Sequence, residues 1–120
     1  FPIQYALLYP ERATNGDLPK FDPVSTASLT FEAMDTSLYP CFELANDVGH
    51  RPGTWPAALM GADEAAVEMF LSGHIKFTEI PDVIHSTLVD HRPVEEPGLV
   101  DVIEAAEWAA THARATVGVV

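Results

Sequence analysis

The most regular hydrophobic pattern in the chain lies between Gly53 and Gly73. Apolar and small residues recur there every three or four positions, at Leu59, Ala62, Ala66, Met69, Phe70 and Gly73. This spacing predicts an α-helix with one apolar face. Asp63, Glu64 and Glu68 fall mainly on the opposite face. We expect Leu59, Ala66, Met69 and Phe70 to be buried against the helices that follow.

Both ends of this predicted helix carry recognisable residues. Thr54 or Trp55 stands where an N-cap is needed, and Pro56 falls in the first turn, where its missing N–H costs nothing. Gly73 ends the helix because glycine adopts the left-handed conformation without a steric penalty. Gly61 and the alanines keep the helix thin. We therefore expect a central helix with close neighbours on more than one side.

The beginning of the chain shows weaker patterns. Residues 2–9 are apolar and could form two turns of helix, which end at Pro10 because the residue before a proline is pushed out of the helical region. Residues 10–25 are rich in proline, glycine, asparagine and aspartate. This composition predicts a loop or an extended connector, suited to an arm that crosses to another domain.

Residues 27–33 alternate small or polar with apolar positions. Leu29 and Phe31 point one way, and Thr30 and Glu32 the other, which predicts a short β-strand. A single strand is not stable in water, and the chain offers no clear second strand. We therefore expect its partner strand to lie outside this sequence or in a second subunit.

Three further helices are predicted. The first covers residues 38–48, with Thr36 or Ser37 as its cap and Gly49 at its end. The second covers residues 80–89, with Thr78 as its N-cap. Pro81 stands in its first turn, and its buried face holds Ile80, Val83, Ile84, Thr87 and Leu88.

The last helix covers residues 99–117, can break near Glu104, and is anchored by Trp108. The predicted fold class is therefore mainly α. A small four-helix bundle over residues 38–120 follows an extended linker arm and one short β-strand within residues 1–37.

Composition sets limits on the class of protein. The 120 residues suit one domain, and the 48% hydrophobic content suits a packed core. The net charge of −12 disfavours nucleic acid and anionic membranes as partners. No apolar run of about 18 residues is present to span a membrane. The start, Phe1-Pro2-Ile3-Gln4, has neither an initiator Met nor a signal-peptide pattern, so we expect a piece of a longer protein.

Histidines are the first candidates for chemistry. The five are His50, His74, His85, His91 and His112. Asp47-x-x-His50 and Asp82-x-x-His85 would each place an acid and an imidazole on one helical face. The Glu-x-x-His motif of di-iron bundles is absent. Surface or helix-end histidines are therefore preferred to a metal site.

Three other groups have both a reactive and a structural interpretation. Asp63, Glu64 and Glu68 could form an acid–base pair, but a solvated face is preferred. Cys41 lies at a helix start that would stabilise a thiolate, although a lone cysteine is more often a small buried residue. It cannot form an internal disulfide, which fits a reducing compartment. Trp55 and Trp108 are interpreted as core or interface anchors.

Several short motifs occur together in order. They are Pro2-Ile3-Gln4-Tyr5-Ala6-Leu7, Tyr9-Pro10-Glu11-Arg12, Leu29-Thr30-Phe31-Glu32, Asp35, Tyr39-Pro40-Cys41, Leu44-Ala45, Gly53-Thr54, Pro56-Ala57, Glu64, Ala66-Val67, Phe70-Leu71, Ile75, Phe77 and Ile80. Across nearly the whole chain they resemble the C-terminal region of the 1-deoxy-D-xylulose 5-phosphate reductoisomerase family. That family usually has Leu-Asn-Ala-Ala-Asn-Glu where this chain has Leu59-Met60-Gly61-Ala62-Asp63-Glu64, which suggests a divergent member.

The resemblance implies a function for the complete protein. The family converts 1-deoxy-D-xylulose 5-phosphate to 2-C-methyl-D-erythritol 4-phosphate with NADPH and a divalent metal, Mg or Mn, in isoprenoid biosynthesis. The cofactor, metal and phosphate sites lie in its first two domains. This chain would be the end of the catalytic domain and the linker (1–37) and the helical bundle (38–120). No catalytic, cofactor-binding or metal-binding residue is assigned to it.

The resemblance also implies partners and a location. The chain would contact the catalytic domain of the same protein, within a homodimer in the bacterial cytoplasm or the plastid. Two alternatives stay open: a free-standing helical interaction module, and the same domain of a paralogous reductase. A glycine-rich nucleotide-binding stretch upstream in the gene would distinguish the module from an enzyme domain.

Overall fold

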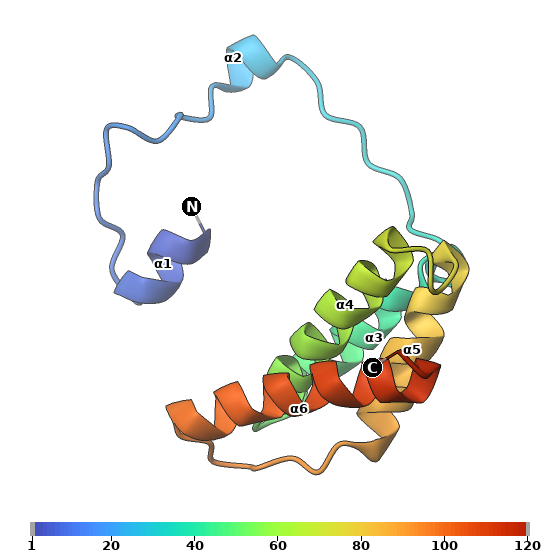
Figure 1. Ribbon diagram of the computed structural model, residues 1–120. Coiled ribbons are helices and arrows are strands. Elements are labelled where there is room, and N and C mark those ends of the chain that lie inside the picture. The colour runs from blue at the N-terminus through green and yellow to red at the C-terminus, as the bar shows by residue number, and fades with distance from the viewer. Residues whose placement is uncertain (1, 120) are drawn as a thin grey trace. The chain divides into compact units, whose positions relative to one another are not determined.

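The computed structural model describes residues 2–119, and all its regular structure is helical (Figure 1). The α-helices are α1 (Pro2–Leu8), α2 (Pro23–Thr26), α3 (Pro40–Gly49), α4 (Trp55–Leu71), α5 (Ile80–Asp90) and α6 (Leu99–Val117). The 3-10 helices are η1 (Thr36–Leu38) and η2 (Phe77–Glu79). The chain divides into two compact units, Phe1–Ala33 and Met34–Val120. The prediction of a mainly α protein is confirmed.

The helix predicted over residues 2–9 is confirmed, since α1 covers Pro2–Leu8. Contacts around α1 hold the first unit together. The Tyr5 and Tyr9 rings meet edge to face at 5.6 Å. The guanidinium of Arg12 lies 4.5 Å from the centroid of the Tyr5 ring. The connector predicted over residues 10–25 is not wholly without regular structure, because α2 begins near its end. The Asp22 carboxylate caps α2 by accepting the Val24 N–H at 3.0 Å.

The strand predicted over residues 27–33 is wrong for this chain, since residues 2–119 contain no strand. Leu29 and Phe31 are 60% and 88% exposed. A strand needs a neighbour to pair its backbone N–H and C=O groups, and none of the described residues supplies one. Alternation alone was not enough to form the element.

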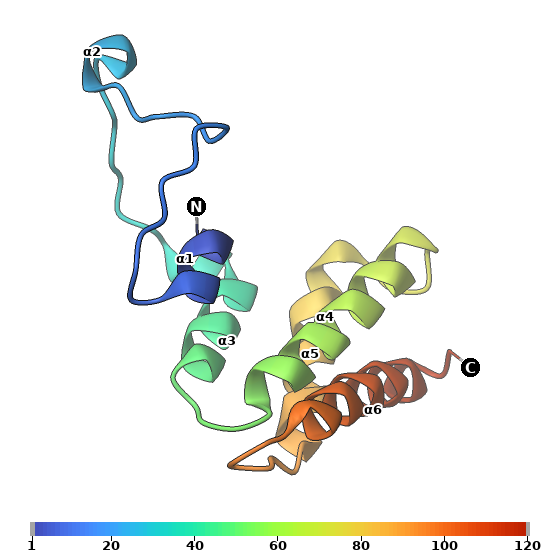
Figure 2. The ribbon, with the colours of Figure 1, turned by 90° about the vertical axis from the view of Figure 1, so that its left-hand side faces the viewer.

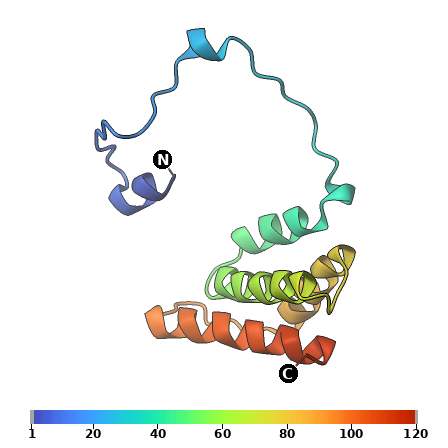
Figure 3. The same ribbon diagram turned by 45° about the horizontal axis from the view of Figure 1, so that its top comes forward.

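In the second unit α4 is the central helix, as predicted. It packs against α3, α5 and α6, and Figure 3 shows it between α3 and α6. Figure 2 shows α6 running alongside α4. A Cβ atom added to Gly61 would lie 2.1 Å from the carbonyl oxygen of Ala106 in α6. The missing side chain at Gly61 therefore lets the two helices approach closely.

The core contains many alanines and few large side chains. Its buried residues are Val48, Ala58, Ala62, Ala65, Ala66, Met69, Ile80, Val83, Ile84, Leu88, Ala109 and Ala113. Leu59 is partly buried against them. The expected burial of Phe70 is wrong: the side chain is 36% exposed and packs edge to face on Phe77 at 5.6 Å. Met69, one position earlier, takes the core place instead and is 2% exposed.

The prediction that Gly73 ends the central helix is confirmed. Gly73 has φ +80°, and its N–H donates to the Phe70 carbonyl at 3.0 Å. The N–H of His74 donates to the Met69 carbonyl at 2.9 Å. Together these bonds form a Schellman motif, which satisfies carbonyl groups that the helix end leaves free.

The starts of α3 and α5 differ from the predicted caps. Asp35, not Thr36 or Ser37, accepts a backbone N–H at the start of η1, which directly precedes α3. Thr78 lies inside η2, so it is not the N-cap of α5. In η2 it is the Glu79 carboxylate that accepts the Lys76 N–H, at 2.6 Å. These two carboxylates bond at the starts of the 3-10 helices, whereas α3 and α5 themselves begin after Tyr39 and Glu79 with no side-chain cap.

The last helix is continuous, so the predicted break near Glu104 is wrong. The Gly98 N–H donates to the Asp101 carboxylate at 2.7 Å where α6 begins. Gly118 has φ +80° where it ends. The helix buries Ala109 and Ala113 in its alanine-rich part, whereas the apolar residues at its start, Leu99, Val102 and Ile103, are exposed. None of the described helices is long and apolar enough to cross a membrane.

Candidate functional site

A buried polar contact joins the start of α4 to the end of α5. Thr54 is 1% exposed, and its Oγ1 atom lies 3.0 Å from Nε2 of His91. The Val94 N–H donates to the same Oγ1 at 3.1 Å, and the Thr54 N–H donates to the Val94 carbonyl at 3.1 Å. Thr54 thus occupies the predicted N-cap position but caps nothing. Its hydroxyl holds the loop between α5 and α6 against α4.

His91 is enclosed by aromatic rings. Its imidazole centroid lies 5.2 Å from that of Trp55 and 5.3 Å from that of Trp108. Burial lowers the pKa of His91 below its ordinary value of 6.5. In the neutral ring, Nε2 can accept the hydroxyl proton of Thr54 while the Thr54 oxygen accepts the Val94 N–H. His91 is the C-cap of α5, so it is a helix-end imidazole as expected, but it is 6% exposed and does not lie on the surface.

Charged groups border this aromatic cluster. The guanidinium of Arg51 lies 4.5 Å from the Trp55 ring centroid. Trp108 stacks on His112 at 4.9 Å, and His112 Nε2 lies 3.0 Å from the Asp90 carboxylate. Trp55 and Trp108 are the anchors predicted from the sequence. They hold a packing junction between α4, the end of α5 and α6.

The two acid–imidazole spacings considered from the sequence, Asp47/His50 and Asp82/His85, form no ion pair among the described residues. Asp47 pairs with Arg51, whereas Nδ1 of His50 contacts the carbonyl oxygen of Asn46 at 2.6 Å. Nδ1 of His74 lies 2.9 Å from the Ser72 hydroxyl. His85 and Asp82 are both exposed on α5. Within residues 2–119, no group of three or more His, Cys, Asp or Glu side chains could hold a metal ion.

Cys41 has the environment of a small packed residue. It is partly buried against the core of the second unit. Burial, and secondarily the Asp63 carboxylate, raise the pKa of its thiol above the ordinary value. The thiol form is therefore favoured, and the helix start does not produce a reactive thiolate.

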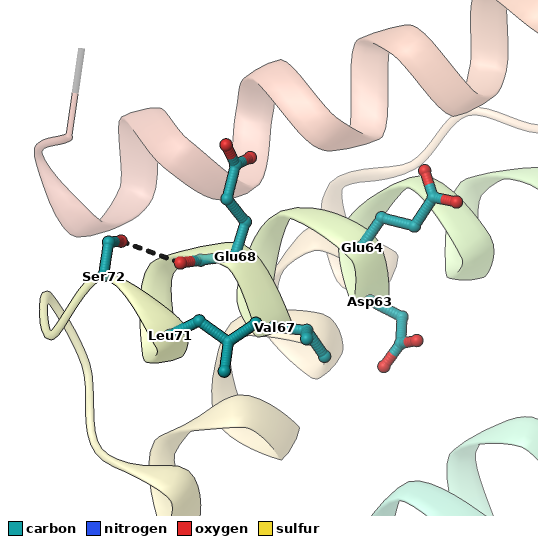
Figure 4. A pocket seen from close by; sticks show the side chains of 6 residues that line it. All are labelled: Asp63, Glu64, Val67, Glu68, Leu71 and Ser72. Atoms are coloured by element: carbon teal, nitrogen blue, oxygen red, sulfur yellow. Dashed lines mark hydrogen bonds between the residues drawn. The ribbon is translucent and has the colours of Figure 1, made fainter.

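The three acidic residues of α4 border a shallow pocket of about 540 Å³ (Figure 4). Its lining is Asp63, Glu64, Val67, Glu68, Leu71 and Ser72. Glu68 forms an ion pair with Arg114 of α6 at 2.6 Å. The Ser72 hydroxyl donates to the Glu68 carbonyl at 2.7 Å. No imidazole or second helix completes an acid–base pair in this lining, so the geometry supports the solvated-face interpretation.

A second pocket, of about 530 Å³, lies within the first unit. Its lining is Pro2, Gln4, Tyr5, Glu11, Arg12, Ala13, Asn15 and Leu18. Arg12 packs over Tyr5, and the Gln4 side chain donates to the Ala13 carbonyl at 3.2 Å. These contacts fold residues 11–18 back onto α1.

The residues present do not fit the cofactors implied by the resemblance. The described chain has no cluster of metal ligands, as stated above. Its glycines with positive φ are Gly53, Gly73 and Gly118. Gly73 and Gly118 follow helix ends, and Gly53 lies against the Val94 carbonyl. A dinucleotide site would need a glycine-rich turn between a strand and a helix, and this part of the chain contains no strand.

Sequence reasoning missed the Thr54–His91 contact. The two residues are 37 positions apart, so no local spacing relates them. Thr54 precedes a helix, where a threonine is usually interpreted as an N-cap. His91 follows a helix, where a histidine is usually interpreted as favoured by the helix dipole. Neither position by itself indicates a contact between the two residues.

Comparison with known proteins gives one consistent result. Residues 1–112 match the family described as the DXP reductoisomerase C-terminal domain. The 1-deoxy-D-xylulose 5-phosphate reductoisomerase of Pelotomaculum thermopropionicum is 48% identical over 108 residues, covering 90% of this chain and 28% of that protein. The enzyme of Thermomicrobium roseum is 46% identical over 118 residues, covering 98% of this chain and 30% of that protein.

A solved structure has the same fold. The reductoisomerase of Zymomonas mobilis in complex with NADPH is similar with a TM-score of 0.74 and 28% identity, covering 99% of this chain and 31% of that one. The chain thus spans 28–31% of the length of these relatives. The family match and the sequence identities show that the chain belongs to the DXP reductoisomerase C-terminal domain family.

Proposed function

We propose that this chain is the C-terminal structural domain of an NADPH-dependent 1-deoxy-D-xylulose 5-phosphate reductoisomerase. The complete protein would convert that substrate to 2-C-methyl-D-erythritol 4-phosphate with a divalent metal, Mg or Mn. The observation that carries the proposal is the family match over residues 1–112. Support also comes from the similarity to a reductoisomerase solved in complex with NADPH.

Within the complete protein, the domain would brace the catalytic domain and supply no reacting group. Three polar side chains are buried among the described residues. Thr54 and His91 bond to each other, and the Thr87 hydroxyl donates to the Val83 carbonyl at 2.9 Å. No buried side-chain nitrogen or oxygen among the described residues lacks a hydrogen-bond partner. No buried polar group of the described residues is therefore left unpaired to meet a substrate or cofactor, which supports a bracing role.

The proposal includes the organisation of the complete protein. Residues 1–37 would be the end of the catalytic domain and the linker, and residues 38–120 the helical bundle. The partner of the bundle would be the catalytic domain of the same chain, in a homodimer. The location would be the bacterial cytoplasm or the plastid, by similarity to the family.

Activity of the complete protein and of two pieces tests the proposal. The complete protein should oxidise NADPH when given 1-deoxy-D-xylulose 5-phosphate and Mg²⁺ or Mn²⁺. The 120-residue chain alone should neither turn over the substrate nor bind NADPH, because it has no phosphate-binding loop. A complete protein without residues 34–120 should lose thermal stability and turnover together. Full turnover and unchanged stability of the deletion variant would contradict the bracing role. Binding of NADPH by the 120-residue chain with micromolar affinity would contradict the proposal that the cofactor binds in another domain.

A further inference from the structure

One face of the central helix is left open by the bundle. Three neighbours, α3, α5 and α6, pack against α4. The open face carries Met60, Val67 and Leu71, which are 52%, 38% and 77% exposed. Their separations of seven and four residues place them along one line on the helix surface. A line of apolar side chains on an exposed helix face is suited to burial by a covering partner.

The edge of this open face carries negative charge. Asp63, Glu64 and Glu68 line the pocket of about 540 Å³ together with Val67 and Leu71 (Figure 4). Arg114 neutralises Glu68. The ion pairs among residues 2–119 include neither Asp63 nor Glu64. The open face therefore presents an apolar line beside two carboxylates without a cationic partner in the described part of the chain.

Charge decides which partner can cover this face. A second copy of the chain also carries a net charge of −12, so two such faces would repel each other. A segment with apolar side chains flanked by lysine or arginine would bury the line and pair with Asp63 and Glu64. We propose that the open face of α4 docks such a basic, apolar segment from the remainder of the same protein. This inference rests on the proposed function, in which the chain is one domain of a larger enzyme.

Two residues of this face are among the positions where the chain departs from the pattern of the family that it resembles. Met60 and Asp63 stand where the resembled family usually has asparagine, and both are exposed on α4. An asparagine side chain offers hydrogen bonds, whereas Met60 offers apolar area and Asp63 a charge. The docking segment should therefore place an apolar side chain near Met60 and a cation near Asp63.

Oxidation of Met60 in the complete protein measures whether the face is covered. Mild peroxide oxidises exposed methionine, and mass spectrometry of peptides gives the rate at each site. Met60 should oxidise much more slowly than free N-acetylmethionine amide. In the variant Asp63→Lys/Glu64→Lys, like charges would oppose the docked segment, and the rate at Met60 should rise by about tenfold or more.

A matched variant controls for the change in charge. Glu104→Lys/Glu107→Lys makes the same change on exposed positions of α6, and it should leave the rate at Met60 unchanged. Circular dichroism should show the same helix content in all forms, because all four substituted side chains are exposed. The neutral variant Asp63→Asn/Glu64→Gln should give an intermediate rate.

Two results would overturn the inference. Met60 oxidising in the parent protein as fast as the free compound would show that the face is open. Continued protection of Met60 in the Asp63→Lys/Glu64→Lys variant would show that the covering segment is not basic. Neither result depends on turnover, so the test is separate from the deletion experiment that decides the bracing role.

Discussion

Oγ1 of Thr54 and Nε2 of His91 lie 3.0 Å apart, although 37 residues separate them in the chain. The contact joins the residue before α4 to the residue after α5. The Val94 N–H donates to the same hydroxyl, so one side chain organises three segments. Since Thr54 and His91 are both buried, the loss of this contact should reduce stability more than any exposed hydrogen bond of the bundle.

Replacing Thr54 by valine tests this contact. Valine keeps the branched shape but leaves His91 and the Val94 N–H without the hydroxyl. The free energy of unfolding should fall by about 1–3 kcal/mol. Thr116→Val is the matched control, because the exposed Thr116 hydroxyl donates only to the His112 carbonyl of its own helix. That control should stay within about 0.5 kcal/mol, as measured by urea unfolding. Equal effects of the two substitutions would contradict the importance of the buried contact.

The stability of the bundle should depend on the protonation of His91. Burial holds its pKa below 6.5 in the folded chain, so the unfolded chain binds the proton more readily. The contribution of this group is therefore complete above pH 6.5, and it is lost as the pH falls from there through the pKa of the folded state.

Urea unfolding of the parent and of His91→Gln at a series of pH values measures this dependence. The difference in unfolding free energy between the two proteins should shrink as the pH falls from about 7.5 to about 5. A difference between parent and His91→Gln that grows in acid would show that the folded state favours the imidazolium.

Gly61→Ala tests the close approach of α4 and α6. The added Cβ would lie 2.1 Å from the Ala106 carbonyl oxygen, so α6 must move, and stability should fall by about 1–3 kcal/mol. Gly49→Ala is the control, since nothing lies within 4 Å of its added Cβ. It should be neutral or raise the unfolding temperature. An unchanged stability of Gly61→Ala would show that α6 shifts at little cost.

Met69→Ala and Phe70→Ala compare two neighbouring apolar residues of α4. Met69 is 2% exposed in the core, so its truncation should cost about 2–5 kcal/mol. Phe70 is 36% exposed, and its main loss is the edge contact with Phe77. Its truncation should cost less than that of Met69. Unfolding by urea gives both values, and the reverse order would restore Phe70 to the core.

The central helix was predictable because its signals are local. The three- and four-residue spacing, Pro56 in the first turn and Gly73 at the end each act on the few residues next to them. The sequence did not determine which side of the helix faces the core. Small residues lie on most sides of α4, so the pattern did not distinguish whether Met69 or Phe70 faces the core.

Elements and contacts that depend on distant groups could not be derived from the sequence. The alternation of residues 27–33 is a local strand signal, but pairing needs a second strand that residues 2–119 do not provide. The Thr54–His91 contact likewise forms only after the bundle has assembled.

The acidic residues of α4 were assigned to an exposed face, and the structure places Asp63 and Glu64 there.

The central claim is that the helices around α4 form a self-contained domain and that the first 33 residues do not. Amide hydrogen exchange of the 120-residue chain, read residue by residue by NMR, tests it most directly. Backbone N–H groups within α4 and α5 should be strongly protected, whereas residues 1–33 should exchange rapidly. Strong protection from Leu29 to Phe31 in a monomeric chain, or rapid exchange throughout α4, would contradict the account.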